Sequence, residues 1–99
     1  MKFEFVEFYE CKLETRPKGF LGTVHIYAID CNLDIRGIRV VKKGKELYFS
    51  LPHFKAVDEE SGIFVWYPLI RWTDEKTQKE MMDFLKKHVR PIVKERIKK

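Results

Sequence analysis

Apolar and polar side chains alternate along residues 33–52 in the pattern of two β-strands joined by a tight turn. Leu33 and Ile35 share one parity, but the apolar parity has moved by one residue when the pattern resumes at Ile38. A β-bulge, which is one extra residue in a strand, produces such a shift, and glycine tolerates the backbone that a bulge needs. The pattern therefore predicts a hairpin with a bulge at Gly37.

The turn of this hairpin is predicted at residues 41–45, where Gly44 is free to adopt a positive φ. Apolar residues alternate again over residues 47–51. Pro52 ends this strand because proline has no N–H to donate to a neighbouring strand.

Alternation predicts three further strands, over residues 3–14, 20–30 and 63–67. Residues 53–62 form the longest polar segment and are predicted to be an exposed loop. A helix is predicted to begin after Thr73 as its N-cap. Its apolar row of Met81, Leu85 and Val89, at four-residue spacing, would pack on the sheet.

Five strands and one helix predict an α+β fold: an antiparallel β-sheet of about five strands followed by a C-terminal helix packed on it. The length of 99 residues suits one domain, which we expect over residues 1–90. Pro91 kinks or ends the predicted helix, so residues 91–99 are expected to form a basic C-terminal tail. Two alternatives stay open for this tail. It is a free arm, or it packs on the sheet as the last turn of the core.

The positive charge is concentrated at the C-terminal end. The chain has a net charge of +5, of which residues 86–99 carry +6 and the remainder −1. Such a segment attracts polyanions, nucleic acid first and acidic membrane surfaces second. A plainer interpretation is a solvated helix end, because cations suit the C-terminus of a helix.

The chain is expected to be cytoplasmic and to have no membrane partner. No apolar run approaches the roughly 20 residues that span a bilayer, and the first ten residues alternate charged and aromatic side chains, unlike a signal peptide. Cys11 and Cys31 lack the spacing of metal ligands and are expected to be buried strand residues.

No arrangement of residues typical of catalysis stands out. The three histidines, at positions 25, 53 and 88, are far apart in sequence, and His25 is expected to be packed or paired in a strand. A nucleophile also needs a base and an orienting group, and no glycine-rich phosphate loop is present. We therefore expect no enzymatic activity, no cofactor, no metal and no small-molecule substrate.

A series of motifs follows in order along residues 33–70: DIRGIRV, a basic glycine turn, LYFSLP, a glycine after a polar loop, and Tyr-Pro-Leu before the final helix. In this order and spacing the chain resembles the stage V sporulation protein G (SpoVG) family of small bacterial regulators, over about residues 5–90. The resemblance implies a sheet-plus-helix protein that dimerises, binds DNA or RNA and has no known catalytic role. It also implies a setting in septation, sporulation or transcription regulation.

The chain departs from the family pattern at three places. Leu51-Pro52 stands where the family usually has Met-Pro, and Tyr67-Pro68 stands where it usually has His-Pro. The segment 53–62 is acidic where the family tends to be basic. A contact between this segment and nucleic acid is therefore not carried over from the resemblance.

The predicted nucleic-acid contacts are basic side chains of the helix, the segment before it and the tail. They are Arg71, Lys76, Lys79, Lys86, Lys87, Arg90, Lys94 and Arg96. The resemblance implies that the first three match the region that faces DNA in the family. Glu75, Glu80 and Asp83 interrupt this basic face, so the alternative is a solvated face of mixed charge.

Aromatic side chains lie near basic ones, as in proteins that stack single-stranded nucleic acid. They are Tyr48, Phe54, Trp66 and Trp72, near Lys42, Lys43, Lys45, Lys55 and Arg71. The alternative is that these aromatics belong to the core or to a dimer interface. We expect a homodimer, because the strands carry more aromatic residues than one helix can cover. The leading hypothesis is a small dimeric nucleic-acid-binding regulator, and the second is a protein-interaction module that binds no nucleic acid.

Overall fold

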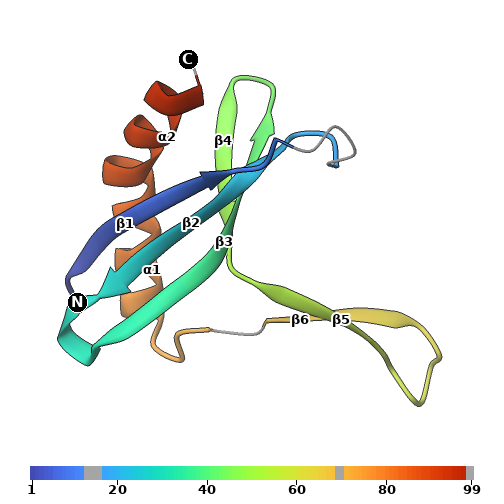
Figure 1. Ribbon diagram of the computed structural model, residues 1–99. Helices are drawn as coiled ribbons and strands as arrows, with labels where there is room; N and C mark the ends of the chain where they lie inside the picture. Colours follow the sequence, from blue (N-terminus) through green and yellow to red (C-terminus); the bar gives the residue numbers. More distant parts are fainter. Residues whose placement is uncertain (13–16, 69–70, 98–99) are drawn as a thin grey trace.

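The computed structural model, which describes residues 1–12, 17–68 and 71–97, has the predicted α+β fold (Figure 1). Four antiparallel strands form the main sheet in the order β1 (Phe3–Glu10), β2 (Phe20–Ala28), β3 (Leu33–Lys43) and β4 (Glu46–Ser50). A short 3₁₀ turn, η1 (Ile29–Cys31), joins β2 to β3. A second sheet pairs β5 (His53–Val57) with β6 (Phe64–Pro68). The C-terminal helix comprises α1 (Glu75–Phe84), a π-helical turn η2 (Leu85–Val89) and α2 (Arg90–Ile97).

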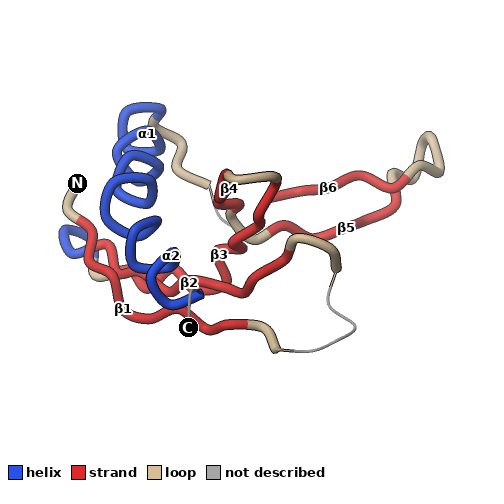
Figure 2. Tube along the Cα trace, turned by 90° about the horizontal axis from the view of Figure 1, so that it is seen from above, coloured by secondary structure: helices blue, strands red, loops and turns tan. Residues whose placement is uncertain are grey.

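The core lies between one face of the main sheet and the C-terminal helix, as the view from above shows (Figure 2). Each strand of the main sheet contributes buried apolar side chains: Phe8, Val24, Ile26, Ala28, Ile35, Ile38, Val40, Leu47 and Phe49. The helix contributes Met81, Leu85, Val89 and Val93, all fully buried. The row predicted at four-residue spacing is therefore confirmed and is one member longer than predicted.

The bulge predicted at Gly37 is confirmed. Val24 pairs with Ile38 and Ile26 pairs with Ile35, so two residues of β3 lie opposite one residue of β2. Gly37 has φ of +75°, in the left-handed region that glycine adopts without strain. Because of the extra residue, Ile35 and Ile38 both point into the core.

The predicted N-cap of the helix was wrong by one residue. Asp74, not Thr73, has the extended backbone of the cap, and its carboxylate accepts hydrogen bonds from the Lys76 N–H and the Thr77 hydroxyl. The Thr77 hydroxyl, and next the Lys76 N–H, lower the pKa of Asp74. Aspartate caps a helix as well as threonine does, so residue type alone did not distinguish the two positions.

The helix does not end at Pro91, and residues 91–97 are not a separate tail. They lie within α2, where Val93 is fully buried and Ile97 packs against the core. In a regular α-helix of 3.6 residues per turn, a row at four-residue spacing rotates by about 40° at each step. The wider turn of η2, in which the Arg90 N–H bonds to the Leu85 carbonyl, rotates less per residue and keeps the row on the sheet. Residues 98 and 99 lie outside the described part of the chain.

The prediction of a loop over residues 53–62 was wrong in part, because residues 53–57 form β5. The predicted strand at 63–67 is β6, but it pairs with β5 and not with the main sheet. The two strands form an arm that extends away from the sheet and helix (Figures 1 and 2). The strand predicted over residues 3–14 is β1, which ends at Glu10, and residues 13–14 lie outside the described residues.

Two further expectations concern exposure. Cys31 is exposed in η1 and Cys11 is half-buried, so the prediction that both are buried strand residues was wrong. His25 is buried, with its Nε2 3.3 Å from a carboxylate oxygen of Asp34, which confirms that it is packed in a strand. None of the helices that the structure describes has the length and apolar character needed to cross a membrane.

Candidate nucleic-acid interface

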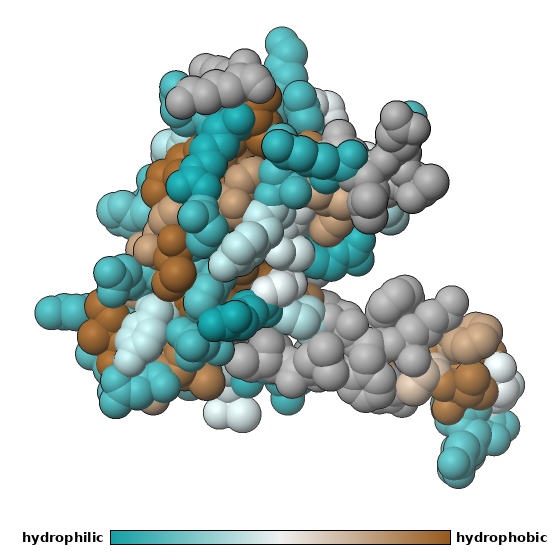
Figure 3. Space-filling model, in the orientation of Figure 1, coloured by the Kyte–Doolittle hydropathy of each residue, from teal (hydrophilic) through white to brown (hydrophobic). Residues whose placement is uncertain are grey.

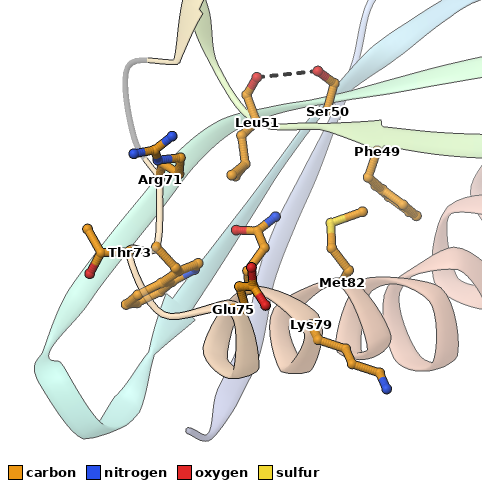
Figure 4. Close-up of a pocket in the computed structure, with 10 residues that line it drawn as sticks. Phe49, Ser50, Leu51, Arg71, Thr73, Glu75, Lys79 and Met82 are labelled. Atoms are coloured by element: carbon orange, nitrogen blue, oxygen red, sulfur yellow. Dashed lines mark hydrogen bonds between the residues drawn. The ribbon is translucent and has the colours of Figure 1, made fainter.

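A hollow of about 790 Å³ lies between the end of β4 and the first turns of α1 (Figure 4). Phe49 and Leu51 line it from β4 and its continuation, and Met82 lines it from the helix. Arg71, from the segment before the helix, and Lys79, from α1, are the basic residues that line it, and the ammonium end of Lys79 points outward, away from Leu51 and Met82 (Figure 4). The hollow therefore combines an apolar floor with cations.

Two smaller hollows of about 370 and 310 Å³ continue this one along β4 and the helix. The first is lined by Glu46, Tyr48, Phe49, Met82, Lys86 and Arg90. The second is lined by Lys42, Lys45, Leu47, Lys94 and Ile97. We refer to the three hollows together as the β4–helix groove. It exists because β4 pairs only with β3 among the described strands, so its other edge is open to the helix.

The groove gathers basic residues from three parts of the chain. Its lining contains seven Lys or Arg and two Glu, a net charge of +5. The cations are Arg71, Lys79, Lys86, Arg90 and Lys94, which the sequence predicted as contacts, and Lys42 and Lys45, which it indicated only as basic residues near aromatic ones. Within the part of the chain that the structure describes, no lysine of the groove forms an ion pair with a carboxylate. These ammonium groups are therefore available to an anionic ligand.

Helical geometry explains why these cations share one side. Lys86, Arg90 and Lys94 follow one another at four-residue spacing, as do the buried residues one position before them, and residues four apart lie on the same face of a helix. Because the buried row faces the sheet, the row beside it faces the open edge at β4. Lys42 reaches the same place from the end of β3, and Lys45 reaches it from the turn between β3 and β4.

Three predicted residues lie elsewhere. Lys87 lines a hollow on the opposite side of the helix, with Met1 and Phe3 near β1. Lys76 is exposed at the first turn of α1. The remaining one, Arg96, also faces β1 and is described next.

Arg96 is engaged by the edge of the sheet opposite to the groove. Its guanidinium forms an ion pair with the Glu7 carboxylate and lies 5.6 Å from the centre of the Phe5 ring. The hydrogen bond from Arg96 is the main cause of the lowered pKa of Glu7. Because its charge already has a partner, Arg96 is a structural cation and not part of the groove.

Arg90 has a different role from the lysines around it. Its guanidinium donates a hydrogen bond to the main-chain carbonyl of Leu47 at 3.1 Å. The Nε atom of Arg90 is buried and has no hydrogen-bond partner among the described residues. Arg90 therefore holds the helix against β4 and supplies positive charge in the middle of the groove.

The aromatic residues that the sequence singled out have different surroundings in the structure. Tyr48 lines the groove with about half of its surface exposed, and the Lys43 ammonium lies 5.8 Å from the centre of its ring. Trp72 is half-buried, donates its indole N–H toward the Met81 sulfur at 3.2 Å and packs edge-on against Phe3. Trp72 thus packs against the core and also lines the first hollow of the groove. The side chains of Phe54, Lys55 and Trp66 lie outside those that the structure describes.

Metal ligands are a separate question. Among the described residues, no group of three or more His, Cys, Asp or Glu is arranged to hold a metal ion.

Comparisons with models of protein families, with curated proteins and with solved structures find no match. The resemblance to the SpoVG family stays a prediction from the motifs.

Proposed function

We propose that this protein is a small regulatory protein that binds nucleic acid through the β4–helix groove and acts as a homodimer. The observation that carries the proposal is the convergence of seven Lys and Arg, from three separate segments of the chain, on one groove of net charge +5. The SpoVG resemblance, which implies a dimeric nucleic-acid-binding regulator, supports the same function.

Phosphate contacts would supply most of the affinity. Each phosphate that a Lys or Arg neutralises releases condensed counterions, and this release makes binding depend on salt. A groove that follows the open edge of a sheet suits an elongated polyanion. Such contacts position a strand without reading its sequence.

A single strand fits the lining of the groove better than a duplex. Tyr48 lines the groove and presents an exposed ring, with Lys43 beside the ring but outside the groove lining, and proteins that bind single strands combine such rings with cations. The apolar floor formed by Phe49, Leu51 and Met82 would accommodate bases that are not paired. The phosphates would follow the row of Lys86, Arg90 and Lys94.

We place the protein in the cytoplasm. Cys31 is a free thiol and is exposed. Free thiols persist in a reducing compartment. The cytoplasm is also where a nucleic-acid-binding regulator of a bacterium meets its ligand.

The second candidate, a protein-interaction module without nucleic-acid binding, is favoured by the apolar residues exposed at the end of the arm. A titration distinguishes the two. Fluorescently labelled single-stranded DNA, RNA and duplex DNA are each titrated with protein between about 50 and 200 mM salt, and anisotropy is measured. If four groove cations touch a single strand, log K falls against log salt with a slope of about −3. No binding at micromolar protein and low salt would instead favour the interaction module.

A further inference from the structure

The arm formed by β5 and β6 stands apart from the rest of the fold. Its two strands pair with each other over residues 53–57 and 64–68, and the arm extends away from the main sheet (Figure 1). An isolated two-stranded hairpin is only marginally stable in water, and packing against another element stabilises it. The arm is therefore a segment that gains from a partner.

The end of the arm combines apolar and acidic side chains. Val57, Ile63 and Phe64 are 52%, 64% and 60% exposed. Figure 3 shows hydrophobic and hydrophilic side chains side by side there. Between them lie Asp58, Glu59 and Glu60, and residues 56–65 contain no Lys or Arg. We refer to residues 57–64 as the arm tip, with a net charge of −3.

The arm tip has an ordered backbone. The Asp58 N–H donates to the Ile63 carbonyl at 2.9 Å, and the Gly62 N–H donates to the Asp58 carbonyl at 2.8 Å. The Asp58 carboxylate accepts a hydrogen bond from the Glu60 N–H at 3.0 Å. Asp58 thus maintains the turn, whereas Glu59 and Glu60 are exposed.

We propose that the arm tip of a second copy of this chain docks in the β4–helix groove. The charges are complementary, since the arm tip carries −3 and the groove +5. The apolar residues are complementary as well. Val57 and Ile63 would cover the floor formed by Phe49, Leu51 and Met82.

The connectivity of the chain suits a reciprocal exchange of arms. Only Leu51 and Pro52 separate β4 from β5, and Leu51 lines the groove, so the groove begins where the arm begins. The arm extends away from its own groove (Figure 1). In a two-fold dimer with the arms antiparallel, each arm tip reaches the groove of the other copy.

Such a dimer needs only modest contacts. A stable interface buries about 1,600 Å² in total. Because a two-fold dimer contains the contact twice, each arm tip and each groove would bury about 400 Å². Eight residues with three exposed apolar side chains can supply that area.

The docked arm tip would cover the cations that we propose for nucleic acid. This consequence rests on the proposed function. It makes the acidic arm tip a competitor of the phosphates, so nucleic acid must displace it from the groove. Docking of the arm is itself independent of nucleic acid and can be tested without it.

The test is a charge exchange between two variants, followed by sedimentation without nucleic acid. The first variant, Glu59→Lys with Glu60→Lys, reverses the arm tip and leaves Asp58 to hold the turn. The second, Lys45→Glu with Lys86→Glu and Lys94→Glu, changes the net charge of the groove lining from +5 to −1. A control variant, Glu4→Lys with Glu10→Lys, makes the same charge change as the first on two exposed residues of β1 outside the groove.

We expect the parent and the control to be dimers at tens of micromolar protein and low salt. Each charge variant alone should be a monomer, because like charges then meet in both contacts. An equimolar mixture of the two variants should form a dimer again, since each arm tip meets a groove of opposite charge. A monomeric parent, or a mixture that stays monomeric, would overturn the proposal. Dimerisation of the first variant on its own would overturn it too.

Discussion

The guanidinium of Arg90 donates a hydrogen bond to the main-chain carbonyl of Leu47, 43 residues away in sequence, at 3.1 Å. This bond joins the C-terminal helix to the open edge strand of the sheet in the middle of the β4–helix groove. An open edge strand invites pairing with other chains, and proteins protect such edges with charged side chains. Arg90 protects this edge and leaves the hollows on either side of it open.

Replacing Arg90 by methionine should lower stability and weaken nucleic-acid binding together. The Leu47 carbonyl would lose a charged donor, which costs on the order of 1–3 kcal/mol. Arg90→Lys keeps the charge without the forked donor, so it should retain most of the salt dependence while losing part of the stability. Urea denaturation and anisotropy measured on both variants check this. An Arg90→Met protein as stable as the parent would show that the bond contributes nothing.

The bulge at Gly37 predicts a second stability effect. Its φ of +75° is unfavourable for a β-branched side chain, so Gly37→Val should cost about 1–3 kcal/mol. A new Cβ would be 3.6 Å from the Pro52 ring, an ordinary contact, so strain of the backbone is the cause. Asparagine tolerates this φ better, and Gly37→Asn should be milder. Equal melting temperatures for the two variants would contradict this explanation.

The C-terminal segment gives a prediction that separates packing from charge. Val93 is fully buried, so Val93→Ala should cost about 2 kcal/mol. Deleting residues 91–99 should therefore lower the melting temperature strongly. Lys94→Gln should leave the melting temperature almost unchanged and reduce the salt slope by about 0.7 for a single strand. If the truncated protein melts like the parent, the segment does not pack on the core.

The cap of α1 predicts a pH dependence. Hydrogen bonds from Thr77 and the Lys76 N–H lower the pKa of folded Asp74, whereas an unfolded aspartate titrates at about 3.9. A lowered pKa in the folded state means that the ionised cap stabilises the protein above the unfolded pKa. This stabilisation is lost as the pH falls through the folded pKa. In Asp74→Asn, melting temperatures between pH 7 and pH 2 should fall less steeply than in the parent. Parallel curves would show that the cap does not contribute.

Local patterns were enough to predict the hairpin, the bulge and the helix. The parity shift at Gly37 is visible in sequence because a one-residue insertion moves every later side chain to the other face. The apolar row beginning at Met81 is visible because residues four apart lie on the same face of a helix. The π turn was not visible in the sequence, because it depends on packing against the sheet. It keeps Leu85, Val89 and Val93 on the side of the helix that faces the sheet.

The strand β5 was missed because Pro52 and an acidic run flank it, and both are typical of loops. The candidate site was predicted only in part, because its residues come from segments that are far apart in the sequence. Helical spacing put Lys79, Lys86 and Arg90 on one face of the helix, whereas Lys94 was assigned to a tail beyond Pro91. Only the pairing of β3 with β4 brings Lys42 and Lys45 beside the helix. The partner of Arg96, which is Glu7, lies 89 residues away, and no local pattern reveals such a pair.

Lys86 and Lys87 offer the most direct test of the proposed interface. They are consecutive, exposed and in the same π turn, but Lys86 lines the β4–helix groove and Lys87 faces β1. Lys86→Glu and Lys87→Glu therefore change the net charge equally and differ only in the side of the helix. Binding of a labelled single strand should weaken about tenfold in Lys86→Glu, or roughly 1.4 kcal/mol, and change little in Lys87→Glu. Equal losses in the two variants would contradict the groove and point to net charge alone.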